Sequence, residues 1–206
     1  MTKLIVIGGG GHAKSLIAVV RKLGTHDLIG YTDKKDRGLL MCVPYLGDDV
    51  VLSEHTDCQL ALGVGSLGTS EARLRILYRF RDDGFEFPTI ISPQSVVSSE
   101  VEIGVGTVVF DGAVINTGTL IGEGSIINSN CTVEHDARIG KNVHVCPGAT
   151  ICGDVTIGDH SFVGAGATII QGRTICAECT IGAGATVVHD CLDAGTYLGT
   201  PARRCP

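Results

Sequence analysis

Aromatic side chains and clustered positive charge are both scarce in this sequence. Of 206 residues only 4% are aromatic and none is tryptophan, and the formal net charge is −6. Lys and Arg do not cluster with interleaved aromatics, which argues against a nucleic-acid partner. The densest basic run, RLRILYRFR at 73–81, has apolar residues at helical spacing. We interpret it as a solvated helix face rather than a phosphate-binding patch.

Long hydrophobic segments are also lacking. The sequence has no run of 18 apolar residues that would suggest a membrane span. Its first residues, MTKLIVIGGGGHAKS, are apolar only briefly and then become rich in glycine, unlike a signal peptide. These features predict a cytoplasmic protein without a membrane partner, in which the nine cysteines are free thiols.

The first 90 residues alternate between strand-like and helix-like segments. The expected strands are 3–8, 27–33, 58–65 and 86–92, and the expected helices are 12–24 and 70–84. Gly24 closes the first helix, and Ser70 is a candidate N-cap of the second. This alternation predicts a small parallel sheet flanked by helices, that is, a Rossmann-like α/β unit over residues 1–92.

After Pro93 the pattern changes to a repeat of six residues. Residues 95–190 divide into 16 hexads, and the third residue of every hexad is Ile or Val. Such a repeat is typical of a parallel β-helix, in which the third residue points inward. Three hexads form an 18-residue coil, so 96/18 gives slightly more than five coils. Known hexapeptide folds are left-handed, so residues 93–206 are expected to form a left-handed parallel β-helix whose ends are covered by the α/β unit and the C-terminal tail.

A glycine-rich loop follows the first expected strand. It has the form G-x-G-x-x-A at Gly8, Gly10 and Ala13, and Asp33 follows 20 residues later, where a Rossmann unit places its ribose-binding acid. A tight turn alone would also use such glycines, but loop, strand, helix and acid together favour nucleotide binding. Because residues 1–92 are few for a full dinucleotide domain, a mononucleotide or nucleotide-sugar fits better.

The segment NSNCTVEHDARIG at 128–140 places Glu134, His135 and Asp136 on a turn of the repeat. Residues 18 apart stack, so Gly153 is expected directly over His135. A carboxylate beside an imidazole fixes its tautomer and raises its basicity. His135 is therefore a candidate general base, although an exposed polar residue without a role would give the same pattern.

Metal-ligand spacing is missing from the β-helix. The gaps between successive histidines at His135, His144, His160 and His189 are 9, 16 and 29 residues. The γ-class carbonic anhydrases, which share this helix, use a zinc-binding pair about five residues apart. The CxxC at 176–179 has no second CxxC to complete a zinc set. We therefore expect no metal site.

The whole chain resembles the bacterial sugar acetyltransferases of the PglD and NeuD type. The segments GGGGHAKS, NSNCTVEHD and YLGTPAR match these families in order and spacing. PglD-like members N-acetylate UDP-linked 4-amino-sugars with acetyl-CoA, and NeuD-like members are associated with O-acetylation of sialic acid. The resemblance implies a homotrimeric, acetyl-CoA-dependent N-acetyltransferase for a nucleotide-linked (UDP-type) 4-amino-sugar in glycan biosynthesis. A sugar O-acetyltransferase of the sialic acid type and a non-catalytic nucleotide-sugar-binding protein are the alternatives.

The resemblance also implies roles for individual residues. His135 would be the general base, Asp136 would orient its imidazole, and Asn128 would be an active-site asparagine. The implied cofactor-binding residues are His144, Gly153, Gly164, Ala165, Ala183 and Pro201, and the implied substrate-binding residues are Gly10, Gly11, His12 and Asp33. The backbone N–H of Gly153 would meet the thioester carbonyl. Whether Asp136 or Glu134 holds the imidazole stays open at the level of sequence.

Overall fold

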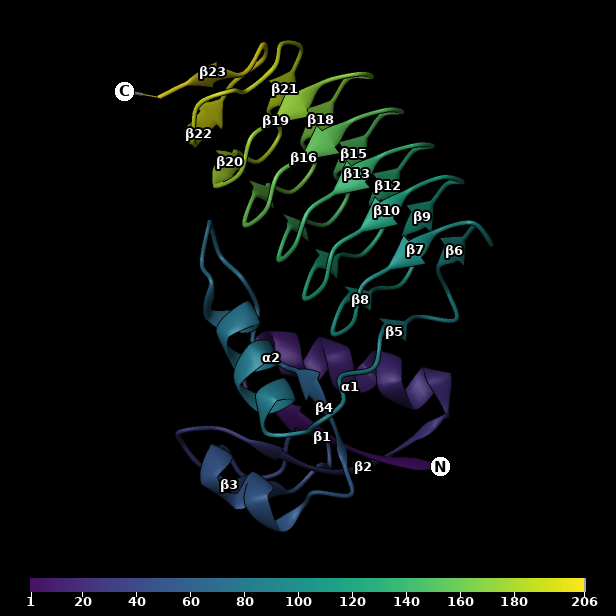
Figure 1. Ribbon diagram of the computed structural model, residues 1–206, viewed down its shortest axis with the longest axis vertical. Coiled ribbons are helices and arrows are strands. Elements are labelled where there is room, and N and C mark those ends of the chain that lie inside the picture. Colours follow the sequence, from purple (N-terminus) through teal and green to yellow (C-terminus); the bar gives the residue numbers. More distant parts are fainter. Residues whose placement is uncertain (206) are drawn as a thin grey trace.

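A computed structural model describes residues 1–205 and consists of an α/β unit and a β-helix stacked along one long axis (Figure 1). The N-terminus lies in the α/β unit and the C-terminal strands lie at the opposite end of the β-helix. Within residues 1–205, none of the helices combines the length and the apolar character needed to cross a membrane.

The α/β unit is built on a four-stranded parallel sheet in the order β3-β2-β1-β4. Its strands are β1 (Thr2–Ile7), β2 (His26–Thr32), β3 (Tyr45–Gly47) and β4 (Gln59–Leu62), and its helices are α1 (Gly11–Leu23), α2 (Ala72–Asp82) and the 3-10 helix η1 (Asp49–Glu54). The three strands and two helices expected before residue 85 are all present, whereas β3 and η1 were not predicted. Helix α1 ends at Gly24, whose φ of 67° is left-handed.

Both faces of β1 are buried, because α1 packs on one side of the sheet and α2 on the other. Leu4 and Val6 lie in the core shared with α1, whereas Ile5 and Ile7 lie in the core shared with α2. The α1 core also takes in residues of the first coils, such as Val108. The α/β unit therefore covers the N-terminal end of the β-helix with a continuous apolar core.

The rest of the described chain forms a prism with three faces, in which every strand except the last runs parallel to its neighbours. The first face carries β5 (Ile90–Ile91), β8 (Val108–Val109), β11 (Ile126–Ile127), β14 (His144–Val145), β17 (Phe162–Val163), β20 (Cys179–Ile181), β22 (Gly195–Leu198) and β23 (Arg203–Arg204). The second face carries β6 (Val96–Val97), β9 (Val114–Ile115), β12 (Thr132–Val133), β15 (Thr150–Ile151), β18 (Thr168–Ile169) and β21 (Thr186–Val187). The third face carries β7 (Glu102–Ile103), β10 (Leu120–Ile121), β13 (Arg138–Ile139), β16 (Thr156–Ile157) and β19 (Thr174–Ile175).

The hexad pattern explains both the core and the corners of this prism. From Val109 to Val187 the third residue of every hexad is at most 4% exposed, so these side chains fill the interior. Corner residues at the sixth position have left-handed backbones, with φ of 55° at Asn130, 59° at Asp136 and 56° at Asp154. Gly, Asn and Asp adopt this conformation at the lowest cost, which explains why they often end the hexads.

One expected strand belongs to the other unit. Residues 86–92 were predicted to close the α/β sheet, but β5 pairs in parallel with β8, and the Ile90 N–H donates to Thr107 O at 3.0 Å. This pairing makes β5 the first strand of the β-helix. At the other end, β22 continues the first face and β23 folds back on it, so the tail covers that end as expected.

Candidate functional site

The turn between β12 and β13 holds His135 at the corner of the second and third faces. Val133 is fully buried, which fixes the turn that follows it. The Nδ1 of His135 lies 2.9 Å from Asp136 Oδ2, whereas Glu134 Oε2 accepts from Asn116 Nδ2 at 2.7 Å. Asp136, not Glu134, therefore contacts the imidazole. A carboxylate accepts hydrogen bonds, so Nδ1 carries the proton and the lone pair is on Nε2.

The surroundings of His135 also increase its basicity. The hydrogen bond that His135 donates to Asp136 raises the pKa of His135 above its ordinary value, against a smaller effect of burial. The negative charges of Asp136, Glu134 and Asp154 act in the same direction. The His135 side chain is 60% exposed, so a bound molecule can reach the imidazole ring. This corner can accept a proton at Nε2.

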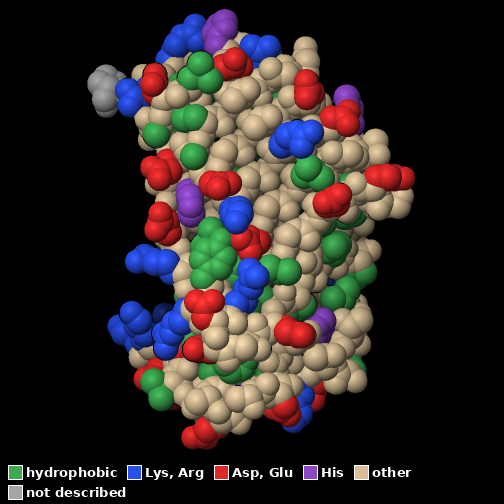
Figure 2. All heavy atoms as spheres, in the orientation of Figure 1, with side chains coloured by type: hydrophobic (Ala, Val, Ile, Leu, Met, Phe, Trp, Pro, Cys, Tyr) green, Lys and Arg blue, Asp and Glu red, His purple; other side chains and the backbone are tan. Residues whose placement is uncertain are grey.

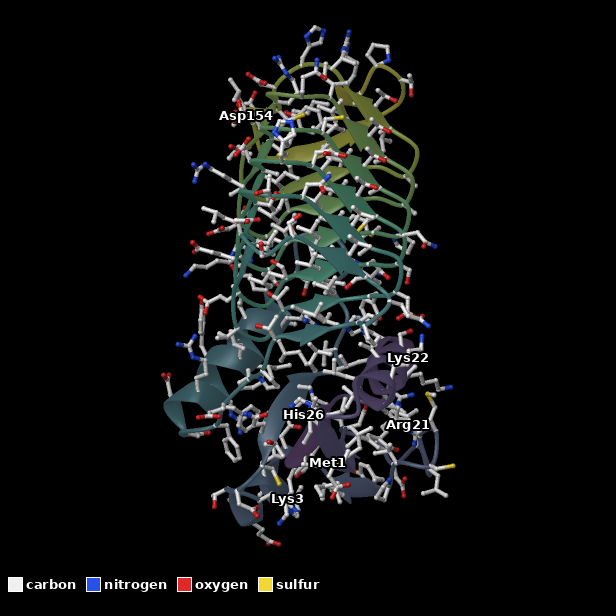
Figure 3. All side chains as sticks on the ribbon, turned by 90° about the vertical axis from the view of Figure 1, so that its right-hand side faces the viewer. Met1, Lys3, Arg21, Lys22, His26 and Asp154 are labelled. Atoms are coloured by element: carbon white, nitrogen blue, oxygen red, sulfur yellow. The ribbon has the colours of Figure 1, made fainter. Side chains whose placement is uncertain are left out.

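Gly153 lies directly over His135, as the 18-residue spacing predicts. The Asp154 N–H donates to His135 O at 3.0 Å, which joins the two turns. A Cβ on Gly153 would lie 2.6 Å from His135 Nε2, so only glycine leaves room for the imidazole. Among residues 1–205, no backbone acceptor takes the N–H of Gly153. Figure 3 labels Asp154 and thus locates this corner on the β-helix, away from the α/β unit.

A second histidine lies on the first face in a different environment. His144, on β14, donates from Nδ1 to Ser66 O at 2.8 Å, and its Nε2 lies 3.0 Å from Asn128 Nδ2. Burial lowers the pKa of His144, and its ring forms a T-shaped pair with the ring of Phe162, with 5.2 Å between the centroids. His144 is therefore a neutral, oriented imidazole. Asn128 contacts this histidine rather than His135.

The corner between the first and second faces holds the other predicted cofactor residues. Asn128 and Gly164 occupy the same hexad position two coils apart. A Cβ on Gly164 would meet the backbone nitrogen of Ala183 at 2.5 Å, and Ala165 O accepts from Gly184 N–H at 2.9 Å. Gly164, Ala165 and Ala183 thus form one small-residue edge. Pro201 is exposed in the tail, which is tied to β21 by the Ala202 N–H bond to Thr186 O at 2.8 Å.

The glycine loop opens α1 and is braced by Asp33. Apart from the adjacent residues and the backbone of α1 itself, no atom of residues 1–205 lies within 4 Å of the place where a Cβ on Gly10 or Gly11 would be, so packing against other elements does not require these glycines. Asp33 accepts from the N–H groups of Gly9 at 2.8 Å and Lys35 at 3.0 Å. Burial alone would raise the pKa of the Asp33 carboxyl, but these donors and the Arg37 guanidinium hold it below its ordinary value. Asp33 therefore holds the glycine loop in place through its hydrogen bond to Gly9.

His12, in the first turn of α1, faces the buried guanidinium of Arg73. Its Nε2 lies 3.4 Å from an Arg73 nitrogen, and Arg73 also donates to Leu62 O at 3.0 Å, Gly124 O at 3.0 Å and Val64 O. Burial and the positive charge of Arg73 lower the pKa of His12 to about 3. His12 is therefore neutral, and because Nε2 faces a donor, its proton is on Nδ1.

The interpretation of residues 73–81 as a solvated helix face is wrong for Arg73. This residue is 1% exposed, and burial lowers the pKa of its guanidinium to about 9. Arg75, Arg79 and Arg81 are exposed, and basic side chains gather on the flank of the molecule that contains α2 (Figure 2). Helical spacing could have indicated that Arg73 is buried, because positions 73, 77 and 80 share one helix face and Leu77 and Phe80 are apolar.

Among residues 1–205, no group of three or more His, Cys, Asp or Glu side chains is arranged to hold a metal ion. The thiols of Cys176 and Cys179 lie 3.4 Å apart within the CxxC.

The predicted site residues thus fall into two groups within one chain. One group is His135, Asp136 and Gly153 at the corner of the second and third faces. The other group consists of the glycine loop, His144 and the small-residue edge. Ser66, which was not predicted, connects the loop side to His144 by accepting its hydrogen bond. A base beside a free backbone N–H is suited to acyl transfer, in which a proton is removed and an oxyanion is stabilised.

Comparisons with known proteins match both units. Residues 3–80 match the family model described as PglD N-terminal domain. Residues 118–153, 136–171 and 154–189 match the model of the bacterial transferase hexapeptide (six repeats). A search among curated proteins found no match.

Several solved structures resemble the whole chain. The acetyltransferase domain of PglB from Neisseria gonorrhoeae FA1090 is 34% identical, with 100% of each chain covered and a TM-score of 0.94. The same domain in complex with acetyl coenzyme A gives 34% identity, 99% coverage of each chain and a TM-score of 0.94. PerB from Caulobacter crescentus, in complex with CoA and GDP-perosamine, is 35% identical over 99% of this chain and 97% of that chain, with a TM-score of 0.90. The predicted fold class, an α/β unit followed by a left-handed parallel β-helix, is confirmed by these similarities.

Proposed function

Because the chain belongs to the hexapeptide-repeat sugar acetyltransferases of the PglD type, we propose that it transfers the acetyl group of acetyl-CoA to the amine of a nucleotide-linked amino-sugar. The more specific form of the proposal is a UDP-linked 4-amino-sugar with His135 as general base. One observation carries it: the Nε2 of His135 lies against Gly153 while Asp136 holds the opposite nitrogen.

Two groups of this corner act on the reacting atoms. Acetyl-CoA supplies an acetyl group already activated as a thioester. As the acceptor amine forms its bond to the acetyl carbon, His135 Nε2 takes the amine proton. The bond to sulfur breaks, CoA leaves as a thiolate, and the proton held by His135 passes to that thiolate to give the free thiol. The N–H of Gly153 stabilises the negative charge on the carbonyl oxygen, an effect of roughly 3–4 kcal/mol for one well-placed donor. Asp136 balances the charge that His135 gains.

The small-residue edge supports binding of the cofactor in an extended form. Gly164, Ala165 and Ala183 leave this corner without large side chains, so a pantetheine arm could lie along it. His144 offers a neutral imidazole at the start of the edge, and Pro201 lies beside its far end. The donor set is therefore made of backbone groups and one histidine, which suits amides and a thioester better than a metal.

The glycine loop supports a nucleotide-linked acceptor. The open space at Gly10 and Gly11 fits a diphosphate, as do the N–H groups at the start of α1, because the first turn of a helix leaves its N–H groups without partners inside the helix. His12 adds an uncharged N–H donor, and Asp33 holds the loop in shape. A free sugar acid such as sialic acid would leave this loop unused, which is why N-acetylation of a nucleotide-linked amine is preferred over O-acetylation.

A homotrimer is part of the proposal. His135 and the glycine loop are in separate groups within one chain, so a single subunit does not assemble them around one acceptor. If prisms pack side by side, His135 of one subunit faces His144 and the glycine loop of the next. The site then forms between subunits.

A GDP-linked amino-sugar is the second candidate for the acceptor. It is favoured by the similarity to PerB, whose structure contains GDP-perosamine. The test is a thiol-release assay with acetyl-CoA and a panel of UDP-, GDP- and dTDP-linked 4-amino-sugars, with sialic acid alongside. We expect release with a nucleotide-linked amine, most strongly with a UDP-linked one. Release with sialic acid alone would overturn the proposal.

A further inference from the structure

The loop between β4 and α2, residues 63–71, connects the α/β unit to the side of the β-helix. In Figure 1 it extends beyond the end of α2 along the flank of the prism. Ser66 O accepts from His144 Nδ1 at 2.8 Å, and Ser70 O accepts from Asn142 Nδ2 at 2.8 Å. The loop is therefore fixed to the β-helix at two points by its backbone.

The first part of this loop runs beside the glycine loop. A Cβ on Gly63 would lie 2.8 Å from Gly8 O, and a Cβ on Gly65 would lie 3.3 Å from His12 Cβ. The next residue, Ser66, contacts His144. Ser66 is therefore located where the chain leaves the glycine loop and reaches the first face of the β-helix.

The hydroxyl of Ser66 is exceptional among the buried serines. Ser66 is 4% exposed, and within residues 1–205 its Oγ has no hydrogen-bond partner. The other three buried serines are bonded: Ser92 Oγ to Asp111 at 2.5 Å, Ser125 Oγ to Gly140 O at 3.0 Å, and Ser161 Oγ to Cys176 O at 3.1 Å. A buried hydroxyl without a hydrogen-bond partner destabilises the folded protein. A bound molecule that forms a hydrogen bond with this hydroxyl would explain why a serine is present.

We infer that the Ser66 hydroxyl binds a hydroxyl group on the sugar ring of the acceptor. This inference rests on the proposed function. With the diphosphate on Gly10 and Gly11, the sugar must extend toward the β-helix for its amine to meet the thioester, and Ser66 lies on that route. A serine hydroxyl donates one hydrogen bond and accepts others, as a sugar hydroxyl does, so the two are matched partners. Ser66 is thus a specificity-determining residue for the sugar.

The test is the Ser66→Ala variant, assayed for acetyl transfer and for thermal unfolding without ligands. Because the lost hydroxyl has no partner in the free protein, the melting temperature should stay the same or rise. The KM for the nucleotide-linked acceptor should increase about 3- to 30-fold through the lost hydrogen bond, while the KM for acetyl-CoA stays unchanged. An unchanged acceptor KM, or a lowered melting temperature, would overturn the inference.

Ser125→Ala is the matched control, because it removes a buried serine hydroxyl that is bonded within the protein. The Ser125 hydroxyl donates to Gly140 O and also accepts from Val143 N–H at 3.0 Å. Its loss should lower the melting temperature and leave the acceptor KM as in the wild type. Ser66→Ala should therefore weaken acceptor binding without loss of stability, and Ser125→Ala should lose stability without weaker acceptor binding.

Acceptors that lack one sugar hydroxyl at a time distinguish a sugar contact from a phosphate contact. For one of these deoxy acceptors, the wild type and Ser66→Ala should have equal KM values, because the shared bond is already missing. If Ser66→Ala instead weakens binding of the free nucleoside diphosphate as much as binding of the full acceptor, Ser66 contacts phosphate and the inference is wrong. Failure of the proposed function would look different, since the wild type would then acetylate none of the nucleotide-linked amines.

Discussion

Replacing Gly153 with alanine tests the contact at the centre of the site. The new Cβ would lie 2.6 Å from Nε2 and 2.7 Å from Cε1 of His135, whereas carbon and nitrogen atoms normally stay about 3.5 Å apart. The imidazole must therefore retreat by about 1 Å. A displacement of that size at a reacting centre costs about 100-fold in rate, which corresponds to about 2.7 kcal/mol of activation free energy.

The same substitution should have little effect on folding. Gly153 is not among the glycines with left-handed φ, so alanine fits its backbone. The His135 side chain is 60% exposed and can turn toward solvent without disturbing the core. We expect the free energy of unfolding to change by less than about 1 kcal/mol, in contrast to the large loss of rate.

The assay is thiol release from acetyl-CoA at saturating acceptor, together with thermal unfolding. The kcat of Gly153→Ala should fall about 100-fold while the protein remains folded. In a His135→Ala background, the second substitution should lower kcat much less, because the group that it displaces is already gone. A folded Gly153→Ala protein with kcat within about twofold of the wild type would refute the reasoning.

Three further predictions concern the charges around the site. Asp136→Asn removes the largest cause of the raised pKa of His135. Because the base must be unprotonated, the rise of kcat/KM with pH should move to lower pH. An unchanged pH profile would contradict the role of Asp136. Asp33→Ala removes the acceptor of the Gly9 and Lys35 N–H groups, so the acceptor KM should rise roughly tenfold or more without a change in the KM for acetyl-CoA, as measured by initial rates. Arg73→Met leaves several carbonyl groups between the two units without a hydrogen-bond donor. It should lower the free energy of unfolding, measured in urea, by about 3–5 kcal/mol. A loss below about 1 kcal/mol would show that these hydrogen bonds contribute little.

The repeat made much of the fold predictable from the sequence. An inward Ile or Val at each third position fixes the register of every coil, and register then fixes which residues stack. That is why Gly153 could be placed over His135 without a structure. Local patterns could not assign residues 86–92, because a short apolar strand fits either a parallel sheet or a β-helix. Its partner is decided by tertiary packing.

The site was less predictable where side chains meet across elements distant in sequence. Both Glu134 and Asp136 flank His135, and only the contact of Glu134 with Asn116, one coil earlier, leaves Asp136 for the imidazole. Ser66 comes from a loop without periodicity, so no pattern connects it to His144. The contact between Ser66 and His144 depends on how the α/β unit packs against the prism, which neither unit's sequence pattern specifies.

The most direct test of the central claim is to identify the acetylated atom in the product. The protein is incubated with acetyl-CoA and its preferred nucleotide-linked 4-amino-sugar, and the product is examined by NMR for a coupling between the acetyl carbonyl and a sugar N–H. The account predicts an amide at the C4 nitrogen, formed by the wild type and formed far more slowly by His135→Ala. An ester on a sugar hydroxyl, or an amide formed equally fast by His135→Ala, would contradict it.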